Sequence, residues 1–260
     1  KFLFGFFIML SVGLININFW QKYSFIFYLV GVIILIYATF YGYIGKGSRR
    51  WINVLGINIQ PSEIMKIFLI LALAKFFDEK KIDNFRDYLF LVFPITLIFI
   101  PFFIVLNQPD LGTSLILLFI GTVVFFIVGI NIKFFFSCLA GFFLLSPIFW
   151  NSLHLYQKQR LLTFFDPYKD PLGTGYHIIQ SQIAIGSGGF LGKGWLKGTQ
   201  SHLDFLPEKK TDFIFSMLGE EFGFLGTISV IGLFTLICCV GYIISIANEK
   251  NFFSKIIGVA

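Results

Sequence analysis

The sequence has few charged residues and few cysteines for its length. Only 13% of its 260 residues are Asp, Glu, Lys or Arg, about half the fraction found in an ordinary soluble domain. Its three cysteines, Cys138, Cys238 and Cys239, all lie inside apolar runs, so they form neither a disulfide framework nor the spacing of a zinc site. These shortages exclude a disulfide-stapled secreted domain and a soluble enzyme.

Apolar residues take the place of the missing charge. They make up 57% of the chain, and the mean hydropathy of +0.83 excludes a disordered chain and exceeds what a soluble core can hide from water. The apolar residues form continuous runs, which is typical of membrane helices rather than of alternating barrel strands. We therefore predict an all-α fold, a polytopic integral membrane helical bundle. Its seven expected spans are residues 2–15, 24–44, 62–77, 88–106, 111–130, 134–150 and 213–247.

The distribution of cations orients this bundle. Successive loops lie on alternate sides of the membrane, and the short loops of one side carry Lys80, Lys81, Arg86, Lys133, Lys250 and Lys255. By the positive-inside rule that side is cytoplasmic. Residues 45–61 then form an outer loop and residues 151–212 a large extracytoplasmic loop, within one membrane domain over residues 1–260. The net charge of +6 indicates contact with anionic lipid headgroups, and we expect no nucleic-acid partner.

The outer loop 45–61 contains a cluster of cations beside an indole. Arg49, Arg50 and Trp51 follow Lys46 and lie at the expected membrane surface. One interpretation is an interfacial anchor, in which Trp sits at the headgroups and the cations reach toward water. The other is a phosphate clamp, because the guanidinium fork matches phosphate oxygens.

Three further charged residues lie at the expected starts of helices. Glu63 and Lys66 are three residues apart, so they share a helix face and can form an ion pair. Such a pair is either a structural closure of the helix end or, because charge is expensive at a membrane, functional. Asp110 precedes the 111–130 run and suits an N-cap.

The large loop contains a glycine-rich stretch, residues 186–194, with Lys193 inside it and Lys197 close behind. It lacks the Ser/Thr that follows the lysine of a phosphate loop. A backbone-amide nest for a phosphate and a plain flexible loop both remain open. The three histidines, His154, His177 and His202, have no metal-ligand spacing.

The end of the large loop carries the acidic residues best placed for chemistry. Asp212 stands where the chain re-enters the membrane, and Glu220 and Glu221 follow inside an apolar run. Asp212 is either a helix cap or a general base. The run 213–247 is longer than one crossing needs, so its start lies outside the hydrocarbon or the helix tilts strongly.

Five ordered blocks of sequence together resemble the SEDS family (shape, elongation, division and sporulation), and in particular its elongation branch. The blocks are KGSRRWI, QPSEIMK, NQPDLGTS, DPLGTGYHIIQSQIAIGSGGFLGKGW and FLPEKKTDFIFSMLGEEFGFLG. Family members have about ten spans, and this chain resembles spans two to eight. We therefore expect it to be a fragment of a longer protein, with the large loop on the periplasmic side of the bacterial inner membrane.

The resemblance implies an activity and a set of residues. Family members polymerise lipid II into glycan strands together with a class B penicillin-binding transpeptidase. By this resemblance Asp212 is the catalytic carboxylate, and functionally important positions match Arg50, Trp51, Glu63, Lys66 and Asp110.

The chemistry of glycan growth is consistent with these residues. The C4 hydroxyl of GlcNAc displaces undecaprenyl diphosphate from C1 of MurNAc, with inversion, so one base on the attacking hydroxyl is needed. Cations or a divalent metal can stabilise the leaving diphosphate. We expect Arg49, Arg50, Lys193 and Lys197 to bind it, and no ligand set in the sequence identifies a metal. A lipid II flippase or a solute transporter without catalytic activity is the alternative.

Overall fold

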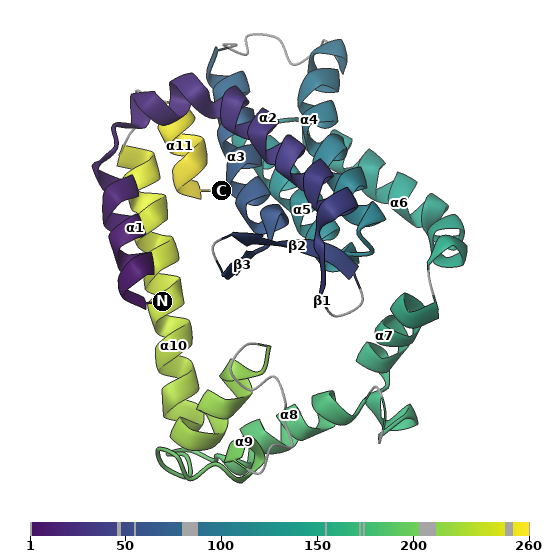
Figure 1. The fold of residues 1–260 in the computed structure, drawn as a ribbon, viewed down its shortest axis with the longest axis vertical. Helices are drawn as coiled ribbons and strands as arrows, with labels where there is room; N and C mark the ends of the chain where they lie inside the picture. The colour runs from purple at the N-terminus through teal and green to yellow at the C-terminus, as the bar shows by residue number, and fades with distance from the viewer. Residues whose placement is uncertain are drawn as a thin grey trace. The chain divides into compact units, whose positions relative to one another are not determined.

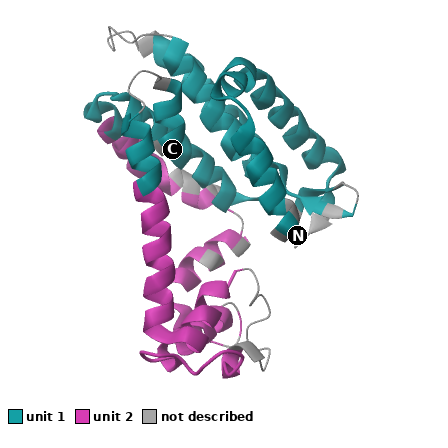
Figure 2. Ribbon diagram, turned by 90° about the vertical axis from the view of Figure 1, so that its left-hand side faces the viewer, with its two compact units in different colours: residues 1–135, 240–260 teal, residues 136–239 magenta. Residues whose placement is uncertain are grey.

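The structure is a computed structural model that describes residues 2–45, 48–54, 56–79, 88–153, 155–171, 173, 175–202, 212–247 and 252–259. Lys46, Lys80, Lys81, Arg86, His154 and Lys250 therefore lie outside the described residues. The chain divides into two compact units, residues 1–135 with 240–260 and residues 136–239 (Figure 2). The elements, labelled in Figure 1 except for η1, are α1 (Phe2–Leu14), α2 (Ile17–Tyr41), β1 (Tyr43–Gly45), β2 (Ser48–Val54), β3 (Ile57–Ile59), α3 (Pro61–Glu79), α4 (Tyr88–Asn107), α5 (Leu111–Val128), α6 (Ile132–Ser152), α7 (Leu155–Phe165), the 3-10 helix η1 (Pro167–Lys169), α8 (Tyr176–Ser187), α9 (Thr199–His202), α10 (Ile214–Ala247) and α11 (Phe252–Val259).

Each predicted span coincides with a helix, and the expected class of polytopic membrane protein is confirmed. Within the described residues, four helices are long and apolar enough to cross a membrane: Ile17–Tyr41, Phe90–Asn107, Leu111–Val128 and Ile214–Ala247. The helices α1 and α6 hold shorter apolar stretches, and α3 carries several charged residues. The count of seven crossings therefore stays a prediction.

The helix α2 begins at Ile17, earlier than the predicted residue 24. Asn16 caps it, and its side-chain oxygen accepts a hydrogen bond from the Asn18 amide at 3.0 Å. Gln21 and Lys22 lie in the first turns of this helix. These two polar residues shorten the apolar run but not the helix, because the cap at Asn16 rather than hydrophobicity fixes where α2 begins.

The outer loop 45–61 folds largely into a three-stranded antiparallel sheet, which the sequence reasoning did not foresee. The strand order is β1-β2-β3, and Ile52 of β2 lies opposite Ile59 of β3. The turn between these strands uses Asn53, whose side-chain oxygen accepts from the Gly56 amide at 3.0 Å. Gly56 has φ of 82°, a conformation that glycine adopts without strain. The sheet holds the Arg49–Trp51 cluster on a defined strand.

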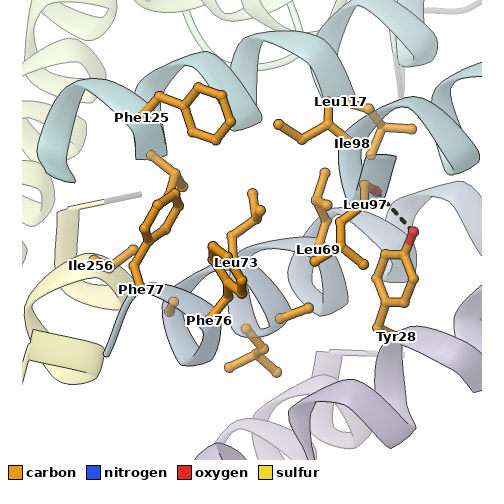
Figure 3. Close-up of a cluster of buried hydrophobic side chains, with 14 of the residues drawn as sticks. Tyr28, Leu69, Leu73, Phe76, Phe77, Leu97, Ile98, Leu117, Phe125 and Ile256 are labelled. Atoms are coloured by element: carbon orange, nitrogen blue, oxygen red, sulfur yellow. Dashed lines mark hydrogen bonds between the residues drawn. The ribbon is translucent and has the colours of Figure 1, made fainter. Parts of the chain in front are cut away.

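The core of the first unit lies between α2, α3, α4, α5 and α11 (Figure 3). Tyr28 of α2 is buried there, and its hydroxyl donates to the Leu97 carbonyl at 2.8 Å. The short helix α11 also packs into this core, and the Phe253 amide donates to Asp78 Oδ1 at 3.1 Å. Burial of these side chains fixes α3 and α5, whose N-terminal ends carry Glu63 and Asp110. The fully or nearly buried members include Leu69, Leu73, Phe77, Leu117, Phe125, Phe253 and Ile256.

The described part of the large loop, in the second unit, contains α7, η1, α8 and α9 rather than extended chain. Asp170 closes the turn that leads into α8. Its carbonyl accepts from the Gly175 amide at 3.0 Å, and its carboxylate accepts from the Gly173 amide at 3.0 Å. These bonds assign Asp170 and the glycines that follow it to a turn.

The helix α10 is broken at Gly223, where φ is 64° and ψ is −157°. Such a backbone conformation is essentially restricted to glycine. The break separates a short helix, residues 214–222, from the long apolar helix that follows it. That the start of the 213–247 run lies outside the hydrocarbon, or that the helix tilts strongly, stays a prediction.

Candidate functional site

Asp212 lies on the turn that leads into α10, and its side chain is exposed. The next residue, Phe213, lies against α8, because its ring centroid is 6.1 Å from that of His177. The Phe213 carbonyl also accepts from the Met217 amide at 3.1 Å. The turn therefore presents a carboxylate outward while the adjacent residue packs inward.

Glu220, in the same short helix, is fully buried and gathers three donors on one oxygen, Oε1. Lys193 Nζ lies at 2.8 Å, Thr199 Oγ1 at 3.1 Å and the Gln200 amide at 3.0 Å. Lys193 Nζ also donates to Thr199 Oγ1 at 3.0 Å. A carboxylate so enclosed is a fixed structural charge rather than a group open to substrate.

The glycine-rich stretch does not present the amide nest considered above over its second half. The amides of Gly192, Lys193 and Gly194 donate to the carbonyls of Gly188, Glu220 and Glu221. Those three amides are therefore occupied by the protein itself. Lys197, just beyond, is exposed.

In the first unit, Asp110 joins α5 to β2 and to the residue that precedes α3. It caps α5 by accepting from the Thr113 amide at 3.3 Å, as the sequence predicts. Its Oδ2 also lies 3.0 Å from Arg50 Nη1 of β2 and 3.1 Å from Gln60 Nε2. The sequence reasoning chose Arg50 and Asp110 separately and missed both Gln60 and the pairing. No local signal links residues so far apart in the chain.

The other half of the cationic cluster lines a cavity. Arg49 and Trp51 contribute to a pocket of about 610 Å³ together with Tyr37, Phe40 and Tyr41 of α2. Arg49 Nη1 donates to the Phe40 carbonyl at 3.4 Å. The remaining lining residues are Gly42, Tyr43, Ile52 and Asn53. The pocket combines aromatic faces with one guanidinium, a suitable surface for a molecule with apolar and anionic parts.

Glu63 and Lys66 form an ion pair of 2.8 Å in the first turns of α3. The Glu63 side chain is 56% exposed. The ion pair is therefore not buried, and breaking it should not have a large effect on stability. Among the residues the structure describes, no three His, Cys, Asp or Glu side chains are grouped so as to hold a metal ion.

The cell cycle protein family of FtsW, RodA and SpoVE matches residues 1–260. This chain belongs to that family. The resemblance drawn from the five sequence blocks is thereby confirmed, and the predicted membership of the SEDS proteins, as they are also called, is correct.

Relatives of this FtsW/RodA/SpoVE member are named for one activity. This chain is 41% identical over 234 residues to the peptidoglycan glycosyltransferase MrdB of Escherichia coli K12, and the match covers 90% of this chain and 62% of that protein. It is 35% identical over 254 residues to the probable peptidoglycan glycosyltransferase FtsW of Buchnera aphidicola from Acyrthosiphon pisum, covering 96% and 63%. The chain therefore spans under two thirds of the length of these relatives.

Solved structures share the fold of this family member. One belongs to a peptidoglycan synthase complex described as coordinating polymerization and crosslinking, with a TM-score of 0.78, 30% identity and coverage of 98% of this chain and 70% of that one. Another is the rod shape determining protein RodA of Thermus thermophilus, with a TM-score of 0.64, 24% identity and coverage of 98% and 68%.

Proposed function

We propose that this protein, in its full-length form, is a peptidoglycan glycosyltransferase that polymerises lipid II into glycan strands during cell elongation. The observation that carries the proposal is the 41% identity to MrdB over 90% of the chain. The exposed position of Asp212 at the start of α10 supports it, since a base must reach its substrate.

In this mechanism Asp212 accepts the proton of the GlcNAc C4 hydroxyl as that oxygen attacks C1 of MurNAc. The bond between C1 and the diphosphate oxygen breaks, and undecaprenyl diphosphate leaves with both electrons of that bond. The anomeric centre inverts from α to β, which requires attack from the face opposite the leaving group. No second carboxylate is needed if cations stabilise the diphosphate as it leaves.

The cations of β2 are our choice for holding the diphosphate. Arg49 and Trp51 line the aromatic pocket. Arg50 is fixed by Asp110 through Nη1, and its side chain keeps 22% exposure, so its guanidinium can also donate to a phosphate oxygen. Lys197 of the second unit is exposed and stays a candidate for the same role. Asp110 then positions Arg50, and Glu63 with Lys66 stabilises the start of α3.

We also propose a cellular location and partners for the protein. We place the protein in the bacterial inner membrane with residues 151–212 on the periplasmic side, where lipid II is consumed. We expect a class B penicillin-binding transpeptidase as its partner, since a structural neighbour belongs to a complex described as coordinating polymerization and crosslinking. Lipid II and the membrane are its other partners.

The test is polymerisation of purified lipid II by the full-length protein, with and without the transpeptidase. We expect glycan strands, with the larger yield when the partner is present. A parallel assay in vesicles measures movement of lipid II across the bilayer. Transbilayer movement without any glycan product would contradict the proposal and favour the flippase alternative.

A further inference from the structure

The break in α10 frees four backbone groups, and the glycine-rich stretch takes up all four. In an unbroken helix the Phe224 and Leu225 amides would donate to the Glu220 and Glu221 carbonyls, four residues earlier. Here the Phe224 amide donates to the Gly189 carbonyl at 2.9 Å and the Leu225 amide to the Phe190 carbonyl at 3.2 Å.

The carbonyls left behind are satisfied by the same stretch. The Lys193 amide donates to the Glu220 carbonyl at 3.0 Å, and the Gly194 amide donates to the Glu221 carbonyl at 2.9 Å. Residues 189–194 therefore replace the missing turn of α10 with hydrogen bonds from outside the helix. This exchange explains how a helix can break beside buried residues without leaving backbone groups unpaired.

The close approach explains the glycines. A Cβ added at Gly188 would overlap the Gly219 carbonyl, and one added at Gly192 would overlap the Glu221 carbonyl. A Cβ at Gly223 would overlap the Gly192 amide nitrogen. Gly188 and Gly192 are thus required for packing against the short helix and the break, whereas a Cβ at Gly186 or Gly189 would meet nothing within 4 Å.

The side chains reinforce this backbone contact. Glu220 is fully buried, and its Oε1 binds Lys193 of the glycine-rich stretch and Thr199 and the Gln200 amide of the segment that follows it. Residues 188–200 therefore hold the short helix 214–222 from its C-terminal end, through both backbone and side chains. Asp212 lies two residues before that helix begins, so its position depends on how the helix is held.

We propose that Lys193 and Glu220 are positioning residues for Asp212, and that Lys193 serves Glu220 rather than the diphosphate of the substrate. This inference rests on the proposed function, because Asp212 is taken as the base. It differs from the sequence-based expectation, in which Lys193 binds the diphosphate. The two alternatives predict different kinetic consequences when the lysine charge is removed.

The experiment compares Lys193→Met, Glu220→Gln and the double variant in the full-length protein, with kcat and KM measured for lipid II polymerisation. Lys193→Met leaves the buried Glu220 carboxylate without its cation. We expect kcat to fall by about ten- to a hundred-fold, as for a catalytic group displaced by a remote change, while KM stays within about twofold of the wild-type value.

The double variant provides the rescue. Glu220→Gln removes the stranded charge, and its amide oxygen can still accept from Thr199 and Gln200. We therefore expect the double variant to have a higher kcat than Lys193→Met alone, because the effects of substituting two residues in contact are not additive. Lys169→Met, an exposed lysine of η1 in the same unit, is the matched control and should retain wild-type kinetics. If Lys193→Met does not fold, Thr199→Val, which removes one neutral donor to Glu220, should still lower kcat without raising KM.

Two results would overturn the inference. A Lys193→Met or Thr199→Val variant with unchanged kcat would show that the contact does not position Asp212. A raised KM in Lys193→Met with no recovery in the double variant would show that Lys193 binds substrate. Wild-type protein that makes no glycan would instead overturn the proposed function and this inference with it.

Discussion

The two compact units each contain a cation paired with a carboxylate, but the pairs are built differently. In the first, Arg50 reaches Asp110 from a strand, and Asp110 also caps α5. In the second, Lys193 meets Glu220 within a contact that replaces a missing helical turn. Asp110 keeps slight exposure, while Glu220 has none. The first pair joins a strand to a helix cap, whereas the second encloses its carboxylate among three donors although the Lys193 side chain stays 28% exposed.

The largest loss of stability should come from Gly223→Ala in the second unit. An alanine there adopts a conformation that costs about 1–3 kcal/mol and displaces Gly192 and Phe190. The nearby hydrogen bonds of the Phe190 carbonyl and the Lys193 amide, worth about 1 kcal/mol each, are then weakened. We expect a marked fall in the thermal unfolding midpoint of the detergent-purified protein.

Gly232→Ala is the control for this change, because a Cβ there meets nothing within 4 Å. It should leave the midpoint unchanged or slightly higher, since alanine favours a helix over glycine. Equal midpoints for Gly223→Ala and wild type would mean that the break in α10 is not held by the glycine stretch.

In the first unit, Asp110 both caps α5 and contacts Arg50 and Gln60, and two substitutions separate these roles. Asp110→Ala removes the cap, worth about 1 kcal/mol, and also the contacts to Arg50 and Gln60, worth about 1 kcal/mol more. Asp110→Asn keeps a capping oxygen but puts an NH2 group where Oδ2 accepts from Arg50 and Gln60, so it removes the charge and those two contacts. The unfolding midpoint should therefore fall further for alanine than for asparagine, and the opposite order would argue against the cap.

Arg50→Lys tests whether the cation of β2 does more than pair with Asp110. Lysine keeps the charge but loses the fork, and one charge-assisted hydrogen bond of about 1.5–3 kcal/mol corresponds to about 10- to 150-fold in substrate binding or turnover. The loss is measured as lipid II binding and polymerisation by the Arg50→Lys and Arg50→Ala variants. Full activity with lysine would identify Arg50 as a membrane anchor.

The smallest effect should come from Glu63 and Lys66. Because Glu63 is 56% exposed, the pair should contribute about 0.2–1 kcal/mol. Alanine at either position and the charge-swapped double variant should then have unfolding midpoints that differ little. A swap clearly more stable than both single variants would show that the pair is effectively buried, as in a membrane.

Local features of this protein could be predicted from the sequence, whereas its long-range contacts could not. The spans, the Asp110 cap and the spacing of Glu63 and Lys66 follow from periodicity and capping, which act within a few residues. The sheet of residues 43–59 was missed because its outer strands are only three residues long and its polar side chains resemble a loop. The Arg50–Asp110 and Lys193–Glu220 contacts depend on tertiary packing, so no local pattern predicts them.

The central claim is that Asp212 is the base for glycan polymerisation. The most direct measurement is the glycan product made from purified lipid II by full-length Asp212→Asn, compared with wild type at equal amounts of folded, membrane-inserted protein. Asparagine keeps the size and the hydrogen-bonding oxygen of the side chain but cannot take a proton. We predict that the variant inserts and folds normally and makes no glycan. Near-normal glycan synthesis by Asp212→Asn would remove this residue from the mechanism.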